Sequence, residues 1–234
     1  ARRSLERVGY PAHSGSPEST RKGSRMASAS PRQEPGLDHR FWEGRYQAGR
    51  TGWERGVPTP AFIRLLASAR APELGRVAVP GCGRGHDALL FAEAGHEVTG
   101  FDFAPSAIAG AKELAAAAGL TDRTTFVVAD ILSPEVHAQP GAFDYVVERA
   151  CYCALHPSDR DRYVANVATM LRPGGRLIGS FFIGPAEGGP PFAATWEEIH
   201  ASMAPWFEVE VLGEPAAETP LAGADLFAIL RRSA

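Results

Sequence analysis

Apolar residues along the chain form short runs that alternate with helical patterns. Seven runs rich in β-branched and aromatic residues predict strands, and segments with apolar residues three and four apart separate the first five. This pattern predicts a doubly wound α/β fold with a mostly parallel sheet. The last strand is expected to be antiparallel, because no helical pattern separates the final two runs. The predicted strands are 77–79, 98–102, 124–129, 143–147, 176–182, 207–212 and 226–230.

Helix boundaries can be assigned from capping residues. Pro105 suits the first turn of a helix that reaches about residue 118, and Ser158 is expected to cap a helix that ends near residue 171. Thr195 and Glu198 match a capping box that starts a third helix. Two further helices are predicted over 61–69 and 88–94.

Composition divides the chain near residue 36. Residues 1–36 are rich in Ser, Pro, Gly and Arg without a periodic pattern, which predicts a disordered segment or an extension. Residues 37–234 are expected to form one domain. Its first part, 37–70, carries several aromatic side chains and is predicted to form a lid: Phe41, Trp42, Tyr46 and Trp53.

A glycine turn follows the first predicted strand, and acids end the next two. Its glycines lie at 81, 83 and 85, whereas the dinucleotide fingerprint needs its third glycine where this chain has His86. This spacing resembles motif I of S-adenosylmethionine-dependent methyltransferases. Asp102 would then bind the ribose hydroxyls, and Asp130 would meet the adenine amino group with Ile131 against the ring. Tight turns and helix caps also use such residues, and a nicotinamide or flavin enzyme is the alternative reading.

The general motif carries an acid two residues before the first glycine, but this chain has Val79. The string Val-Pro-Gly-Cys-Gly-x-Gly-His-Asp at 79–87 instead resembles the thiopurine S-methyltransferase family, with its thiopurine and thiol/halide branches. The resemblance runs from about Phe41 to the C-terminus. It also covers Ala-Asp-Ile at 129–131, Phe-Asp-x-x-x-Glu-Arg-Ala at 143–150, Leu-Arg-Pro-Gly-Gly at 171–175 and Gly-Gly-Pro-Pro-Phe at 188–192.

The resemblance implies methyl transfer from S-adenosylmethionine to a small soft nucleophile, with a thiol as the leading acceptor. Thiopurines, halides and selenium or tellurium species remain open, as does a non-catalytic cofactor-binding module. Arg149 sides with the thiopurine branch, because the plant thiol/halide branch has tyrosine there. Trp53, Arg149 and Tyr152 are expected to serve catalysis, and the segment 190–192 to line the acceptor side. The expected cofactor contacts are Trp42, Tyr46, Trp53, Gly81, Gly83, Gly85, Asp102, Phe103, Asp130, Ile131, Glu148 and Arg149.

Composition narrows the possible partners. A formal charge of −3 gives no reason to expect nucleic acid or an anionic membrane. Three cysteines, at 82, 151 and 153, argue against a disulfide framework, and their spacing is poor evidence for a metal site. We therefore expect a cytoplasmic, monomeric enzyme without a metal, acting on a small molecule.

Overall fold

The computed structural model describes residues 37–137, 141–184, 188–213 and 224–233. The segment 1–36, predicted to be disordered or an extension, lies outside the described residues. The described residues belong to one compact unit that spans Pro35–Ala234. No helix among them is long and apolar enough to cross a membrane.

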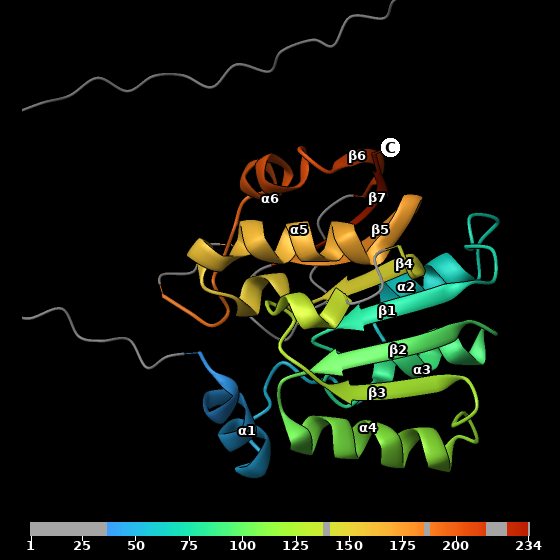
Figure 1. Ribbon diagram of the computed structural model, residues 1–234, viewed down its shortest axis with the longest axis vertical. Coiled ribbons are helices and arrows are strands. Elements are labelled where there is room, and N and C mark those ends of the chain that lie inside the picture. The colour runs from blue at the N-terminus through green and yellow to red at the C-terminus, as the bar shows by residue number, and fades with distance from the viewer. Residues whose placement is uncertain (1–36, 138–140, 185–187, 214–223, 234) are drawn as a thin grey trace, which may run out of the picture. The chain divides into compact units, whose positions relative to one another are not determined.

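A sheet of seven strands runs through the domain in the order β3-β2-β1-β4-β5-β7-β6 (Figure 1). Strands β1 to β5 pair in parallel, and β7 lies antiparallel between β5 and β6. The predicted fold class is therefore confirmed. The strand bounds are β1 Arg76–Pro80, β2 Glu97–Asp102, β3 Thr124–Val128, β4 Phe143–Arg149, β5 Leu171–Ile183, β6 Phe207–Leu212 and β7 Ala224–Arg232.

Helices cover both faces of this sheet, which is why its central strands are buried apolar runs. One face packs residues of α3 and α4 against β1, and the other packs residues of α5 and α6 against β4 and β5. The α-helices are α1 His39–Gln47, α2 Pro60–Leu66, α3 His86–Glu93, α4 Pro105–Ala117, α5 Arg160–Met170 and α6 Trp196–Met203. Short 3₁₀ turns cover η1 Pro134–His137, η2 Tyr152–Ala154 and η3 Pro157–Asp159.

Most local signals agree with the observed boundaries, with two exceptions. Pro105 opens α4, and Thr195 forms the reciprocal capping box with Glu198. The prediction that Ser158 caps the next helix is wrong, because the His156 side chain accepts the Ser158 N–H and caps η3 instead. The Arg-Pro-Gly-Gly stretch belongs to β5, which begins at Leu171 rather than at Arg176.

Candidate active site

The turn between β1 and α3 uses three glycines in the left-handed region that disfavours other residues. Their φ angles are +61° at Gly81, +54° at Gly83 and +82° at Gly85. A Cβ on Gly81 would lie 2.9 Å from the Cys151 sulfur, and one on Gly83 would lie 3.0 Å from the Tyr46 hydroxyl. A side chain at Gly81 or Gly83 would therefore crowd Cys151 or Tyr46, and glycine lets these two residues pack directly on the turn.

The acids that end β2 and follow β3 are held by backbone donors. The Asp102 carboxylate accepts N–H bonds from Gly83 and Ala104, each at 2.9 Å. Burial raises the pKa of Asp102. Asp130 accepts the N–H of Leu132 at 2.8 Å. Each carboxylate keeps lone pairs for a ligand while its orientation is set by the chain.

Helix α1 packs at the amino end of α4 (Figure 1). The Glu43 carboxylate accepts the N–H of Ser106 at 3.0 Å and its hydroxyl at 2.5 Å, and these bonds lower the pKa of Glu43. A negative charge is favourable at a helix N-terminus. Tyr46 and Trp42 of α1 both meet the Trp53 ring edge-on, with centroids 5.7 Å and 5.4 Å away.

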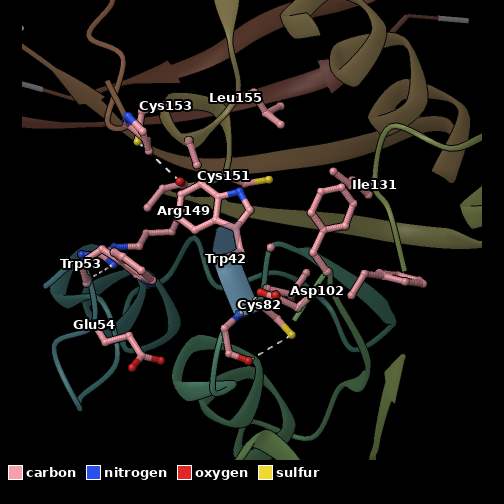
Figure 2. Close-up of a pocket in the computed structure, with 18 of the residues that line it drawn as sticks. Trp42, Trp53, Glu54, Cys82, Asp102, Ile131, Arg149, Cys151, Cys153 and Leu155 are labelled. Atoms are coloured by element: carbon pink, nitrogen blue, oxygen red, sulfur yellow. Dashed lines mark hydrogen bonds between the residues drawn. The ribbon is translucent and has the colours of Figure 1, made fainter. Parts of the chain in front are cut away.

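The loop after α1 is tied to two parts of the sheet's carboxyl edge. Glu54 pairs with Arg84 of the glycine turn at 2.8 Å. The Arg149 guanidinium, at the end of β4, donates to the Trp53 carbonyl at 2.9 Å (Figure 2). These contacts draw the aromatic segment over the ends of β1 and β4.

A cavity of about 360 Å³ lies between this segment and the carboxyl edge of the sheet. Ligands of open α/β sheets bind at this edge. The sequence-predicted site residues that line the cavity are Trp42, Tyr46, Trp53, Gly81, Gly83, Asp102, Phe103, Asp130, Ile131 and Arg149.

Three predicted site residues do not line the cavity. Gly85 caps α3, and a Cβ there would lie 3.1 Å from Ala111 and Phe126, so it serves packing. Tyr152 is 4% exposed and packs edge-on against neighbouring aromatic rings in the core. We therefore withdraw the expectation that Tyr152 is catalytic.

Glu148 is the third residue outside the cavity, and it is 1% exposed. Its carboxylate accepts the backbone N–H groups of Cys151 and Tyr152 at 3.0 Å and 2.9 Å, and the Tyr163 hydroxyl. Successive side chains of a strand point to opposite faces. Glu148 therefore turns into the core beneath α5, whereas Arg149 reaches the cavity.

Several cavity residues were not singled out as site residues from the sequence. Glu54 and Arg84 line one side, and Cys151, Cys153, Leu155 and His156 line another. The segment 190–192, by contrast, was expected at the acceptor side: Pro190 and Pro191 do line the cavity, but Phe192 does not and meets the His156 ring edge-on at 5.5 Å. Glu54 had no sequence signal beyond its place beside Trp53.

The cavity's thiols are protonated at neutral pH. Burial raises the pKa of Cys82 and of Cys151, and it raises the pKa of Cys153 to about 12. In the described part of the chain, no group of three or more His, Cys, Asp or Glu side chains could hold a metal ion. The cysteines are thus small, neutral parts of the cavity wall.

Comparison with known proteins assigns this arrangement to a family. The family model described as thiopurine S-methyltransferase matches residues 37–225. The chain belongs to the thiopurine S-methyltransferase family. It is therefore an S-adenosylmethionine-dependent methyltransferase, and the nicotinamide alternative falls away.

The chain is similar in sequence to two named methyltransferases and in fold to a third. A thiocyanate methyltransferase 1 of Brassica oleracea is 32% identical over 162 residues, or 68% of this chain and 70% of its own length. A thiopurine S-methyltransferase of Xanthomonas campestris is 27% identical over 188 residues, which cover 75% of this chain and 86% of its own length. The fold matches 1,6-didemethyltoxoflavin-N1-methyltransferase of Burkholderia thailandensis, solved with S-adenosylhomocysteine. The TM-score is 0.70 at 22% identity, covering 90% of this chain and 94% of that one.

The family's cofactor fits the residues that line the cavity. Gly81 and Gly83 line the cavity and carry no side chains, so a ligand in the cavity can approach the turn's backbone closely. Asp102 offers a buried, oriented acceptor for hydroxyl groups. Trp42, Tyr46 and Trp53 supply aromatic surface, which suits a sulfonium cation.

Proposed function

We propose that this methyltransferase acts on a small thiol. The observation that carries the proposal is the position of Arg149, whose guanidinium lines the cavity and is fixed by the Trp53 carbonyl. A nearby positive charge lowers the pKa of a thiol and so favours the thiolate, which is the nucleophile. The names of the relatives, thiocyanate and thiopurine S-methyltransferases, support a sulfur acceptor.

In the proposed cofactor orientation, Asp102 binds the ribose hydroxyls and Asp130 the adenine amino group. Ile131 and Phe103 pack beside the base. Gly81 and Gly83 let the methionine end approach the backbone, and Trp42 and Tyr46 cover the cofactor as part of a lid formed by 37–70. The location of these side chains around one cavity supports the orientation.

On the acceptor side, we assign the wall to Cys153, Leu155, Pro190 and Pro191, with Arg149 and Trp53 at its edge. The bound cofactor supplies a methyl group on a sulfonium: the thiolate sulfur bonds to the methyl carbon, the carbon–sulfonium bond breaks, and neutral S-adenosylhomocysteine leaves. Charge is neutralised in this displacement, so a pocket that excludes water favours it. Arg149 holds the thiolate after its proton is lost to solvent, and no side chain is assigned as general base.

A panel of acceptors tests the proposal. Purified enzyme and S-adenosylmethionine labelled in the methyl group are incubated with benzenethiol, hydrosulfide, 6-mercaptopurine, thiocyanate, iodide and selenite. We expect a thiol to have the highest kcat/KM, and Arg149→Met to lower it about tenfold or more, most strongly below the pKa of the thiol. Transfer to a nitrogen or oxygen acceptor with none to sulfur would refute the thiol assignment.

We also propose that the enzyme is monomeric and cytoplasmic and needs neither nucleic acid nor a membrane. The near-neutral charge of −3 supports the absence of polyanionic partners. Cys82, Cys151 and Cys153 are all free, which is usual in reducing compartments. Light scattering coupled to size exclusion tests the monomer, and a mass of two chains would contradict it.

A further inference from the structure

Glu54 has one carboxylate oxygen that is paired and one that is not. Its Oε2 accepts a hydrogen bond from Arg84 Nη1 at 2.8 Å. Its Oε1 is buried and meets no hydrogen-bond partner among the described residues, and the side chain as a whole is 11% exposed. A buried anionic oxygen without a donor costs free energy. A ligand that brings a donor to this oxygen would recover that cost.

This oxygen lies above the glycine turn, beside the cavity. Glu54 is one of the lining residues, and a Cβ built on Gly83 would lie 3.5 Å from Oε1. Asp102 is close enough that the charge of Glu54 adds to burial in raising the pKa of Asp102. Two neighbouring carboxylates in one cavity favour a ligand that carries a positive charge.

The location of Glu54 along the sheet edge indicates which part of the cofactor lies next to it. Arg84 fixes Glu54 over the β1–α3 turn, and Arg149 fixes the preceding residue to β4. In the proposed orientation, the ribose and the adenine lie at Asp102 and Asp130, toward β2 and β3. The methionine end therefore points toward β1 and β4, where Glu54 lies.

We propose that Glu54 Oε1 accepts a hydrogen bond from the α-ammonium group of S-adenosylmethionine. This group is a cation and a donor, as the unpaired oxygen requires. The position of β1 at which the general methyltransferase motif carries an acid is Val79 here, which is 4% exposed and packed in the apolar core. In this proposal the acid for the amino-acid end comes from the loop after α1. This inference rests on the cofactor orientation proposed above.

Calorimetry with two ligands tests the contact. S-Adenosylhomocysteine carries the ammonium group, and 5′-methylthioadenosine shares the adenine, ribose and thioether but lacks the amino-acid part. Glu54→Gln keeps an oxygen for Arg84 and removes the charge. We expect this variant to bind S-adenosylhomocysteine about 10- to 100-fold more weakly and 5′-methylthioadenosine within about twofold of wild type. Glu113→Gln, on the exposed face of α4, is the matched control and should change neither affinity.

A second arm compares two ligands on the wild-type protein, so its main result does not depend on the variant folding. Deaminated S-adenosylhomocysteine should bind wild type more weakly than the parent ligand by a similar factor, and Glu54→Gln should bind both alike. Equal weakening of S-adenosylhomocysteine and 5′-methylthioadenosine would assign Glu54 to the ribose and overturn the inference. Unchanged binding would overturn it too. Failure of wild type to bind S-adenosylhomocysteine at all would instead refute the proposed cofactor site.

Discussion

Replacing Glu148 with glutamine measures what it costs to bury this carboxyl group. Burial raises the pKa of Glu148 from 4.5 to about 7. Each pKa unit corresponds to about 1.36 kcal/mol, so the native state opposes ionisation by a free energy on the order of 3 kcal/mol. Glutamine has the same shape. Its carbonyl can accept the N–H groups of Cys151 and Tyr152, and its amide can donate to the Tyr163 oxygen.

The sign follows from proton binding in the two states. Below pH 4.5 the Glu148 carboxyl is protonated in the native and in the unfolded state, so it does not lower the free energy of unfolding. As the pH rises from 4.5 to 7, the unfolded chain ionises first while the native state keeps its proton, and the free energy of unfolding falls. Glutamine cannot ionise. The unfolding free energy of Glu148→Gln minus that of wild type should therefore increase by about 3 kcal/mol between pH 4.5 and pH 8.

Urea unfolding of both proteins at pH 4.5, 5.5, 6.5, 7.5 and 8 measures this difference. Glu113→Gln, at an exposed position on α4, is the control and should give a difference that does not vary with pH. A difference between Glu148→Gln and wild type that stays constant from pH 4.5 to pH 8 would refute the reasoning. It would mean that the folded protein tolerates the charge of Glu148 as well as water does.

Three further predictions follow from the site and the core. Asp102→Asn should weaken S-adenosylhomocysteine binding about tenfold in calorimetry, because charged acceptors bond hydroxyls more strongly than neutral ones; unchanged affinity would contradict the ribose assignment. Tyr152→Phe should keep kcat and KM within about twofold, since the side chain is buried outside the cavity, and should lower the free energy of unfolding by about 1 kcal/mol. A large loss of kcat with normal stability would restore its catalytic role. Burial lowers the pKa of His96, so protonation of the unfolded chain destabilises the fold as the pH drops below 6.5. His96→Phe should flatten that part of the stability profile measured by urea unfolding, at a cost of about 1 to 3 kcal/mol for the lost acceptor of the Gly75 N–H.

Local sequence signals predicted the glycine turn and the two acids of the site, because each signal depends only on residues that are adjacent in sequence. The glycines at 81 and 83 are required by their own backbone angles, and Asp102 and Asp130 lie where their strands lead. The Ser158 cap was wrong for a similarly local reason. Any of several side chains can satisfy the first N–H groups of a helix, and the neighbouring His156 does so here.

The sequence alone could not show which of residues 148 to 152 line the cavity and which are buried in the core. Glu148 and Arg149 end β4 and Tyr152 follows it, yet of these three only Arg149 lines the cavity. Strand alternation separates Glu148 from Arg149, but which face is core depends on α5 packing there. The η2 turn then buries Tyr152 among aromatic rings that come from α5 and β5.

The sequence by itself determined the fold class, the family and thereby the cofactor. Hydrophobic periodicity and a glycine turn involve residues that are close in sequence, so they can be recognised without knowing which distant residues are in contact. Only the tertiary structure decided which side chains reach the cavity. The Glu54–Arg84 pair joins residues 30 positions apart, and the bond from Arg149 to Trp53 joins residues 96 apart. Such contacts arise when α1 and its loop fold over the sheet edge, and no local pattern specifies them. The unpaired oxygen of Glu54 becomes visible only in that packed state.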